Sequence, residues 1–167
     1  MLKREIRILG LSGTPIGHKI IIASVVFRGA LWLDGVATTV IEAKARNYNL
    51  IISNLIKNSK QYSQLHAIII SPRLTITRAA SIQDLARRLK LPVIAITDSH
   101  LRRSREKRHS SRFTLTVSGE HVDAAFAGVE RKQAEMLYEV SCGPGSKVPE
   151  AVRVAELFAN ELGRILN

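Results

Sequence analysis

The residues best suited to chemistry form a basic run at 99–112, SHLRRSREKRHSSR, in which Glu106 is the single acid. The planar fork of an arginine matches phosphate geometry, and clustered cations gain affinity for a polyanion by releasing its counterions. The run has almost no aromatic side chains for base stacking, so we expect it to follow a phosphate backbone. Its cations are Arg102, Arg103, Arg105, Lys107, Arg108 and Arg112. The alternative is a solvated loop without a partner.

The charge of the whole chain supports the same chemistry. The 167 residues carry 25 Lys and Arg against 14 Asp and Glu, a formal net charge of +11. Such a surface favours polyanions, namely nucleic acid, a ribosome or an anionic membrane. Lys19, Arg73 and Arg78 stand near the ends of predicted strands, where they are further candidates for nucleic-acid contacts. A basic protein that is merely soluble is the alternative.

Metal-assisted cleavage would need acids that converge on one point, because Mg²⁺ and Mn²⁺ prefer anionic oxygen ligands. The acids near predicted strand ends are Asp34, Glu42 and Asp98. Asp34-Gly35 is typical of a type I′ hairpin turn, and Asp98 suits a turn after a strand. Glu42 fits a solvated surface. We therefore predict no metal and no cofactor; a rearranged Mg²⁺ or Mn²⁺ site built from Asp34 and Asp98 stays open.

A glycine-rich stretch at 13–19, GTPIGHK, resembles a phosphate cradle only superficially. It lacks the spacing of a P-loop, and Lys19 is followed by the strand-like run IIIASVVF instead of a helix. We interpret the stretch as a connection between two strands, with Gly13, Pro15 and Gly17 as turn residues. His18 and Lys19 remain candidates for contact with a polyanion.

Nucleophilic catalysis finds little support. Cys142, the single cysteine, precedes Gly-Pro-Gly and has no companion pattern of His and Asn. The five histidines show no metal-ligand spacing such as HExxH. The chain has neither a long uncharged apolar run nor a signal-peptide pattern, so we expect a cytoplasmic protein with no membrane partner.

Hydrophobic patterning places these residues on a mixed α/β sheet flanked by helices. Three strands in meander order come first, with Gly29 as a bulge, and strands then alternate with helices. A basic segment and two C-terminal helices follow, giving the order β-β-β-α-β-α-β within one domain, 1–167. The second C-terminal helix has an apolar stripe of Ala151, Ala155, Phe158, Leu162 and Ile165. The predicted strands are 5–11, 20–33, 36–43, 67–71, 93–97 and an edge strand at 113–117.

Four segments in the same order resemble an uncharacterised, largely archaeal family, the domain of unknown function ninety-nine, a relative of endonuclease V. The most distinctive segment is VVFRGALWLDGV, 25–36. The others are IRILGLSGTPI at 6–16, IIISPRLTI followed by LPVIAIT, and the tail KVPEAVRVAELFANEL at 147–162. The resemblance covers nearly the whole chain and implies a ribonuclease-H-like fold.

The resemblance also implies a metal-dependent nuclease site, and the chain departs from that site. The family pattern has Gly-hydrophobic-Asp-Asp after the first strand, where this chain has Gly10, Leu11, Ser12 and Gly13. A second Asp-Gly is expected after strand 67–70, where Ser71 stands instead. Asp34-Gly35 still matches. A neutral hydroxyl offsets none of a cation's charge, so losing these carboxylates should remove most metal affinity.

Three hypotheses follow. The first is a nucleic-acid-binding protein on an endonuclease-V-like scaffold with a degenerate, inactive nuclease site, for DNA or RNA, a ribosome-associated role included. The second is an active nuclease with a relocated Mg²⁺ or Mn²⁺ site that depends on Asp34 or Asp98. The third is a protein-interaction module that keeps the scaffold for its surface. Enzymatic activity thus stays open, with inactivity favoured.

Overall fold

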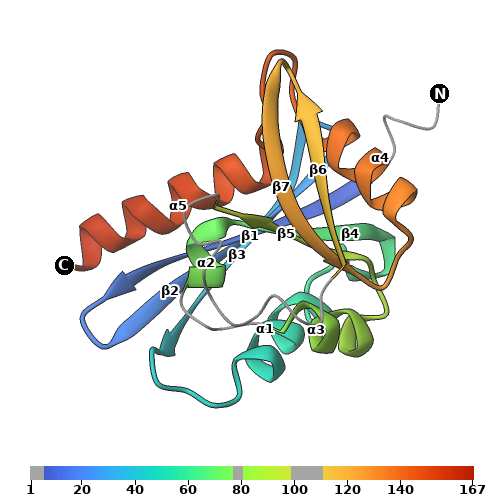
Figure 1. Ribbon diagram of the computed structural model, residues 1–167. Helices are drawn as coiled ribbons and strands as arrows, with labels where there is room; N and C mark the ends of the chain where they lie inside the picture. Colours follow the sequence, from blue (N-terminus) through green and yellow to red (C-terminus); the bar gives the residue numbers. More distant parts are fainter. Residues whose placement is uncertain (1–5, 77–80, 99–110) are drawn as a thin grey trace.

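One mixed sheet carries the whole architecture. The computed structural model describes residues 6–76, 81–98 and 111–167 (Figure 1). Seven strands form the sheet in the order β3-β2-β1-β4-β5-β7-β6. The predicted order, β-β-β-α-β-α-β followed by C-terminal helices, is confirmed, with two additions: a short helix at Pro72–Ile76 and a strand at Glu120–Ala127, next to the far edge strand.

The first three strands form an antiparallel meander, as expected. They are β1 (Arg7–Ile16), β2 (Lys19–Arg28) and β3 (Trp32–Glu42). β1 ends five residues later than predicted, so Gly13 and Pro15 lie inside the strand and only Gly17 turns the chain, with φ +54°. Pro15 is tolerated because β4 pairs with β1 only as far as Leu11. Its missing N–H therefore costs no hydrogen bond between β1 and β4.

The predicted turn at Asp34-Gly35 is wrong. The chain turns earlier, at Gly29, whose φ of +60° suits glycine. Gly35 pairs with Val26 and Leu33 with Phe27, so Asp34 is the extra residue of a β-bulge inside β3. The bulge was expected at Gly29 and the turn at Asp34-Gly35. The structure has the turn at Gly29 and the bulge at Asp34, because the hairpin closes before the chain reaches the Asp-Gly pair.

Two parallel strands extend the sheet from β1. β4 (Leu65–Ile70) pairs with β1, and β5 (Val93–Thr97) pairs with β4. The connections contain α1 (Tyr48–Lys57), the 3₁₀ turn η2 (Tyr62–Gln64), α2 (Pro72–Ile76) and α3 (Ile82–Leu89). The predicted cap of α3 is present, because the Ser81 side chain accepts a hydrogen bond from the Asp84 N–H.

A hairpin ends the sheet. β6 (Ser111–Val117) is the edge strand, as predicted, but β7 (Glu120–Ala127) between β5 and β6 was missed. The turn between them is Ser118-Gly119, with φ of +51° and +79°. A Ser-Gly pair between two apolar runs is a turn signal, and it was the available clue to β7.

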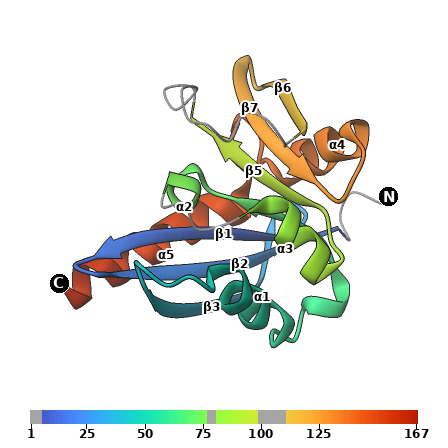
Figure 2. The same cartoon turned by 60° about the horizontal axis from the view of Figure 1, so that its bottom comes forward.

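Helices cover both faces of the sheet (Figure 2). α1 and α3 cover one face, over a core that includes Leu9, Ile68 and Val93. α4 (Arg131–Ser141) and α5 (Glu150–Leu166) cover the other, over a core that includes Ile8 and Ile94. No described helix is long and apolar enough to span a bilayer.

Candidate functional site

The carboxyl ends of the three parallel strands meet at one edge of the sheet. Ser12 lies near this end of β1, Ser71 follows β4, and Asp98 follows β5. Ligands of open α/β sheets bind at such carboxyl ends. We call this the carboxyl edge. It is where the family resemblance would place metal-binding carboxylates.

α5 brings a carboxylate to this edge that the sequence analysis missed. The Ser71 Oγ donates a hydrogen bond of 2.6 Å to Glu156 Oε1, and Ser71 is fully buried. Glu156 and Asn160 lie one turn apart, beside the buried Ala155 and Ala159. Two polar residues spaced by four along an apolar helix were a signal that one flank faces something polar.

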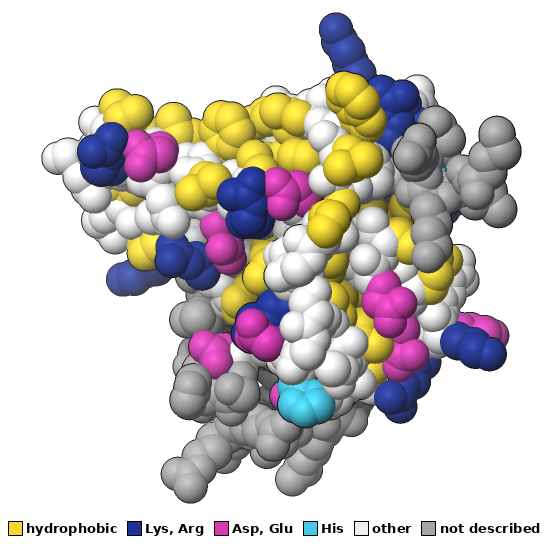
Figure 3. All heavy atoms as spheres, turned by 90° about the horizontal axis from the view of Figure 1, so that it is seen from above, with side chains coloured by type: hydrophobic (Ala, Val, Ile, Leu, Met, Phe, Trp, Pro, Cys, Tyr) yellow, Lys and Arg dark blue, Asp and Glu magenta, His cyan; other side chains and the backbone are white. Residues whose placement is uncertain are grey.

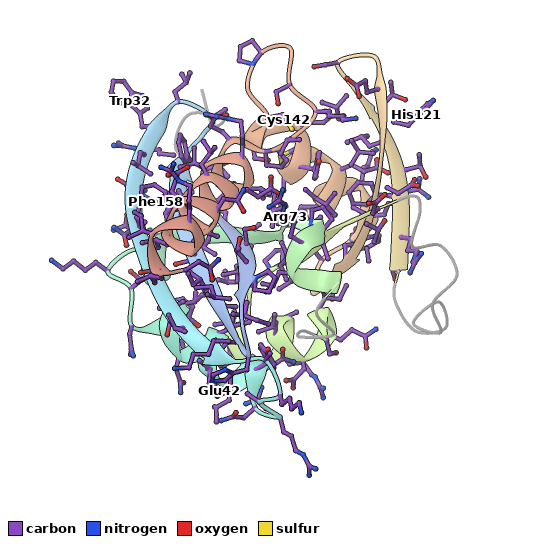
Figure 4. The ribbon with its side chains drawn as sticks, turned by 90° about the vertical axis from the view of Figure 1, so that its left-hand side faces the viewer. Trp32, Glu42, Arg73, His121, Cys142 and Phe158 are labelled. Carbon is purple, nitrogen blue, oxygen red and sulfur yellow. The ribbon has the colours of Figure 1, made fainter. Side chains whose placement is uncertain are left out.

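Asn160 joins this edge to a basic side chain. Its Oδ1 accepts hydrogen bonds from Thr14 Oγ1, at 2.9 Å, and from Arg73 Nη1, at 2.7 Å. Arg73 is exposed at the start of α2, and no carboxylate of the described residues forms an ion pair with it. The guanidinium therefore keeps its charge at the carboxyl edge while a neutral amide orients it (Figure 4).

The residues present do not fit the divalent metal that the family resemblance implies. A Cβ at Gly13 would lie 2.9 Å from the Leu74 side chain, so a carboxylate at this position would have to displace that buried side chain. Ser12 is fully buried, and its Oγ has no hydrogen-bond partner. Over 6–76, 81–98 and 111–167, no three Asp, Glu, His or Cys side chains are grouped as metal ligands would be.

A cavity of about 360 Å³ opens beside the carboxyl edge, between β5, β7, α4 and α5. Its wall includes Asp98, Asp123 and Glu156 together with His121 and Lys147. Lys147 also forms an ion pair with Glu120. The cavity wall therefore combines carboxylates with a lysine, close to the carboxyl end of β5.

The two acids considered for a rearranged metal site lie far apart. Asp98 is at the carboxyl edge, whereas Asp34 Oδ2 accepts a 2.6 Å hydrogen bond from Arg7 Nε. Arg7 pairs with Leu65 where β1 and β4 begin, at the opposite end of the sheet. Asp34 and Asp98 therefore cannot bind one metal ion. Asp34 instead forms an ion pair with Arg7.

The predicted cations are spread over the molecule. Lys19 sits at the tip of the β1–β2 hairpin, 4.0 Å from Glu42, so its charge is partly offset. Arg112 is on the edge strand β6, level with the middle of β5, and only Arg73 lies at the carboxyl edge. The remaining candidates lie outside the described residues: Arg78, Arg102, Arg103, Arg105, Lys107 and Arg108.

Cys142 has the chemistry of an inert thiol. It donates a hydrogen bond to the Tyr138 carbonyl. Burial raises the pKa of Cys142 to about 12, and Glu139 adds to the rise. A thiol with so high a pKa is a poor nucleophile at neutral pH.

Comparison with known proteins assigns the chain to a family. The family model described as endonuclease dU matches residues 4–163. The chain belongs to the endonuclease dU family. A UPF0215 protein of Methanosarcina acetivorans is 29% identical over 182 residues, which cover 95% of this chain and 91% of the relative.

Solved structures show the same fold at low identity. A protein of unknown function from Archaeoglobus fulgidus superposes with a TM-score of 0.75 at 21% identity, over 94% of this chain and 98% of its own. Endonuclease V of Bacillus subtilis superposes with a TM-score of 0.69 at 11% identity, over 96% of this chain and 81% of that one. The endonuclease-V-like fold predicted from the sequence is therefore confirmed.

Proposed function

We propose that this chain is a basic nucleic-acid-binding protein on an endonuclease-V-like scaffold, with a degenerate and inactive nuclease site. The observation that supports the proposal is the set of residues at the carboxyl edge. Hydroxyls of Ser12 and Ser71 and the closely packed Gly13 stand where metal-binding carboxylates would be needed. Glu156 already accepts the Ser71 hydroxyl.

Charge supports the binding half of the proposal. The net charge of +11 suits a phosphate backbone, and Arg73 presents an oriented guanidinium at the carboxyl edge. In the sequence, the basic run 99–112 follows Asp98 directly, and Asp98 lies at this same edge. Arg73 and the run would thus contribute to one nucleic-acid surface.

The family description names the first substrate to test. Because the family is described as endonuclease dU, DNA that contains deoxyuridine belongs beside ordinary single- and double-stranded DNA and RNA. A protein that reads mainly backbone charge would bind all of them. A clear preference for deoxyuridine would instead indicate recognition of the base.

The test is a fluorescence-anisotropy titration of these nucleic acids across a range of salt concentrations. We expect binding that weakens steeply with salt, since each phosphate contact contributes roughly 0.9 to the slope on duplex DNA. Arg73→Gln should lower the slope by about 1, and neutralising 102–108 should lower it further.

Lys57→Gln is the matched control, because it removes the same charge. Lys57 ends α1, which leads into the amino end of β4, far from the carboxyl edge. Its substitution should leave the slope nearly unchanged. Absence of binding at low salt would refute the proposal. Equal losses for Arg73→Gln and Lys57→Gln would refute the assigned surface.

An active nuclease with a relocated site is the second candidate, because Asp98 and Glu156 both line the cavity beside Ser71. This candidate predicts cleavage that requires Mn²⁺ or Mg²⁺ and is lost in Asp98→Asn and in Glu156→Gln. Asp34→Asn is its control, since Asp34 lies at the opposite end of the sheet. Metal-dependent cleavage with this pattern would replace the first proposal.

A further inference from the structure

The apolar side chains of α5 span a wider arc of the helix surface than the part that packs on the sheet. Its small residues Ala151, Ala155 and Ala159 are buried against the sheet. Glu156 and Asn160 mark the flank that faces β4 and α2. Since consecutive helix residues are about 100° apart, Phe158, Leu162 and Ile165 lie on the opposite flank.

The predicted apolar stripe therefore divides in two. Ala151 and Ala155 are buried, whereas Phe158 is 38% exposed and Ile165 is 72% exposed. Figure 4 shows Phe158 on the side of α5 that faces β3. This flank carries large apolar side chains for which the described chain provides no cover.

β3 presents matching side chains next to this flank. Val36 pairs with Val25, and Val40 pairs with Ile21. Val25 is buried in the core beneath α5, so the cross-strand neighbour Val36 points to the same face, and Val40, an even number of residues away, does too. Val36 is 40% exposed and Val40 49% exposed. We call this surface the α5–β3 face: Leu33, Val36, Val40, Phe158, Leu162 and Ile165.

β3 is also an edge strand that is open to another strand. Among the described strands, it pairs only with β2. Natural edges are usually protected by lysine, proline, a β-bulge or a short length. β3 spans 11 residues and contains neither lysine nor proline. Its bulge at Asp34 disturbs the first part, so the regular pairing surface is 36–42.

The charged side chains along α5 and at the end of β3 form ion pairs. Glu150 pairs with Arg153 and Glu161 with Arg164 along α5, and Figure 3 shows hydrophobic side chains along the helix between such pairs. Lys19 approaches Glu42 at the end of β3. The positive charge that favours a polyanion is therefore not concentrated here, and a second copy meets little repulsion.

We propose that the α5–β3 face is a homodimer interface in which residues 36–42 of two copies pair as antiparallel strands. Such pairing has two-fold symmetry, so it places the two apolar faces side by side on one continuous sheet. Contiguous exposed apolar side chains usually mark an interaction surface, and a stable interface needs about 800 Å² per partner. The inference does not depend on the proposed nucleic-acid binding.

The test is sedimentation equilibrium of the full chain, freed of nucleic acid, at low and high salt. We expect a mass twice the 18.5 kDa of the chain. The dimer should persist at high salt, because its interface is apolar and neutral. A dimer held together by bound nucleic acid would dissociate instead.

Two substitutions on different elements test the interface. Val40→Lys places a charge on β3, and Ile165→Glu places one on α5; both side chains are exposed, so the monomer should still fold. Each should raise the dimer dissociation constant at least about 100-fold. Leu50→Lys is the control, since Leu50 is exposed on α1, on the other face.

Circular dichroism confirms that each variant is folded. The proposal is overturned if the parent chain is a monomer at high micromolar concentration. It is equally overturned if both Val40→Lys and Ile165→Glu stay dimeric, or if Leu50→Lys dissociates as readily as they do. A monomeric parent would direct the search to a different apolar partner.

Discussion

Gly10 determines how closely α5 approaches the sheet. A Cβ at this position would lie 2.2 Å from the backbone carbon of Ala151 and 2.4 Å from the backbone nitrogen of Val152. Backbone atoms cannot move aside as a side-chain end can. The carboxyl edge depends on this contact, because the same helix holds Glu156 against Ser71.

We therefore expect Gly10→Ala to destabilise the fold by about 3 kcal/mol or more, through overpacking against a backbone. Chemical denaturation followed by circular dichroism measures the loss. Gly143→Ala is the matched control, since nothing lies within 4 Å of its Cβ position, and it should change stability by less than about 0.5 kcal/mol. A Gly10→Ala variant as stable as this control would contradict the packing argument.

At the scale of elements, the side chain of Asp84 connects α1 and α3, the two helices on the face of the sheet opposite α5. Asp84 in α3 accepts hydrogen bonds from Arg88 on its own helix and from Asn49 in α1. The Arg88 hydrogen bond, and then that of Asn49, hold the pKa of Asp84 below its usual range. The charged form of Asp84 therefore links α1 to α3.

This link should be pH-dependent. Because the pKa of Asp84 is lower in the folded than in the unfolded chain, its contribution is present above about pH 4 and is lost as the pH falls through the folded value. We expect Asp84→Asn to lower Tm at pH 7 and the difference from the parent to shrink in acid. Glu161→Gln, on exposed α5 surface, should change Tm little at either pH. A difference that persists undiminished at low pH would indicate that shape, not charge, explains the loss.

At the scale of the whole molecule, an endonuclease-V-like fold surrounds an edge whose described residues include no metal-ligand set. Fold alone does not assign activity, because the same scaffold serves different sites. Here the fold matches endonuclease V of Bacillus subtilis, while the carboxyl edge carries Ser12, Gly13 and Ser71. The disagreement between scaffold and site leads to a direct test with metal ions.

We expect millimolar Mn²⁺ or Mg²⁺ to leave Tm unchanged, because a ligand stabilises a fold only by binding the native state. Differential scanning calorimetry with and without metal measures the shift. A rise in Tm that grows with Mn²⁺ and vanishes in Glu156→Gln or Asp98→Asn would support the relocated nuclease site. A rise that survives both substitutions would indicate surface binding elsewhere.

The sequence by itself determined the order of the elements and the class of sheet. Runs such as IIIASVVF and VIAIT are short, continuous and rich in β-branched residues, which is typical of strands buried on both faces. The spacing of Ile82, Leu85, Ala86 and Leu89 likewise predicted α3, whose buried residues are these four. The absence of carboxylates at Ser12 and Ser71 was also visible, because it is a matter of residue type.

Only the tertiary structure decided which residues meet. Asp34-Gly35 has the local preference of a turn, but pairing of β2 with β3 and the ion pair with Arg7 hold Asp34 in a bulge. Glu156 and Ser71 are 85 residues apart, and no local pattern records their hydrogen bond. The helical spacing of Phe158 and Ile165 is typical of core residues. Both are exposed, because the sheet covers only part of the apolar surface of α5. Local preference depends on neighbours in the chain, whereas contacts and exposure depend on which elements the sheet brings together.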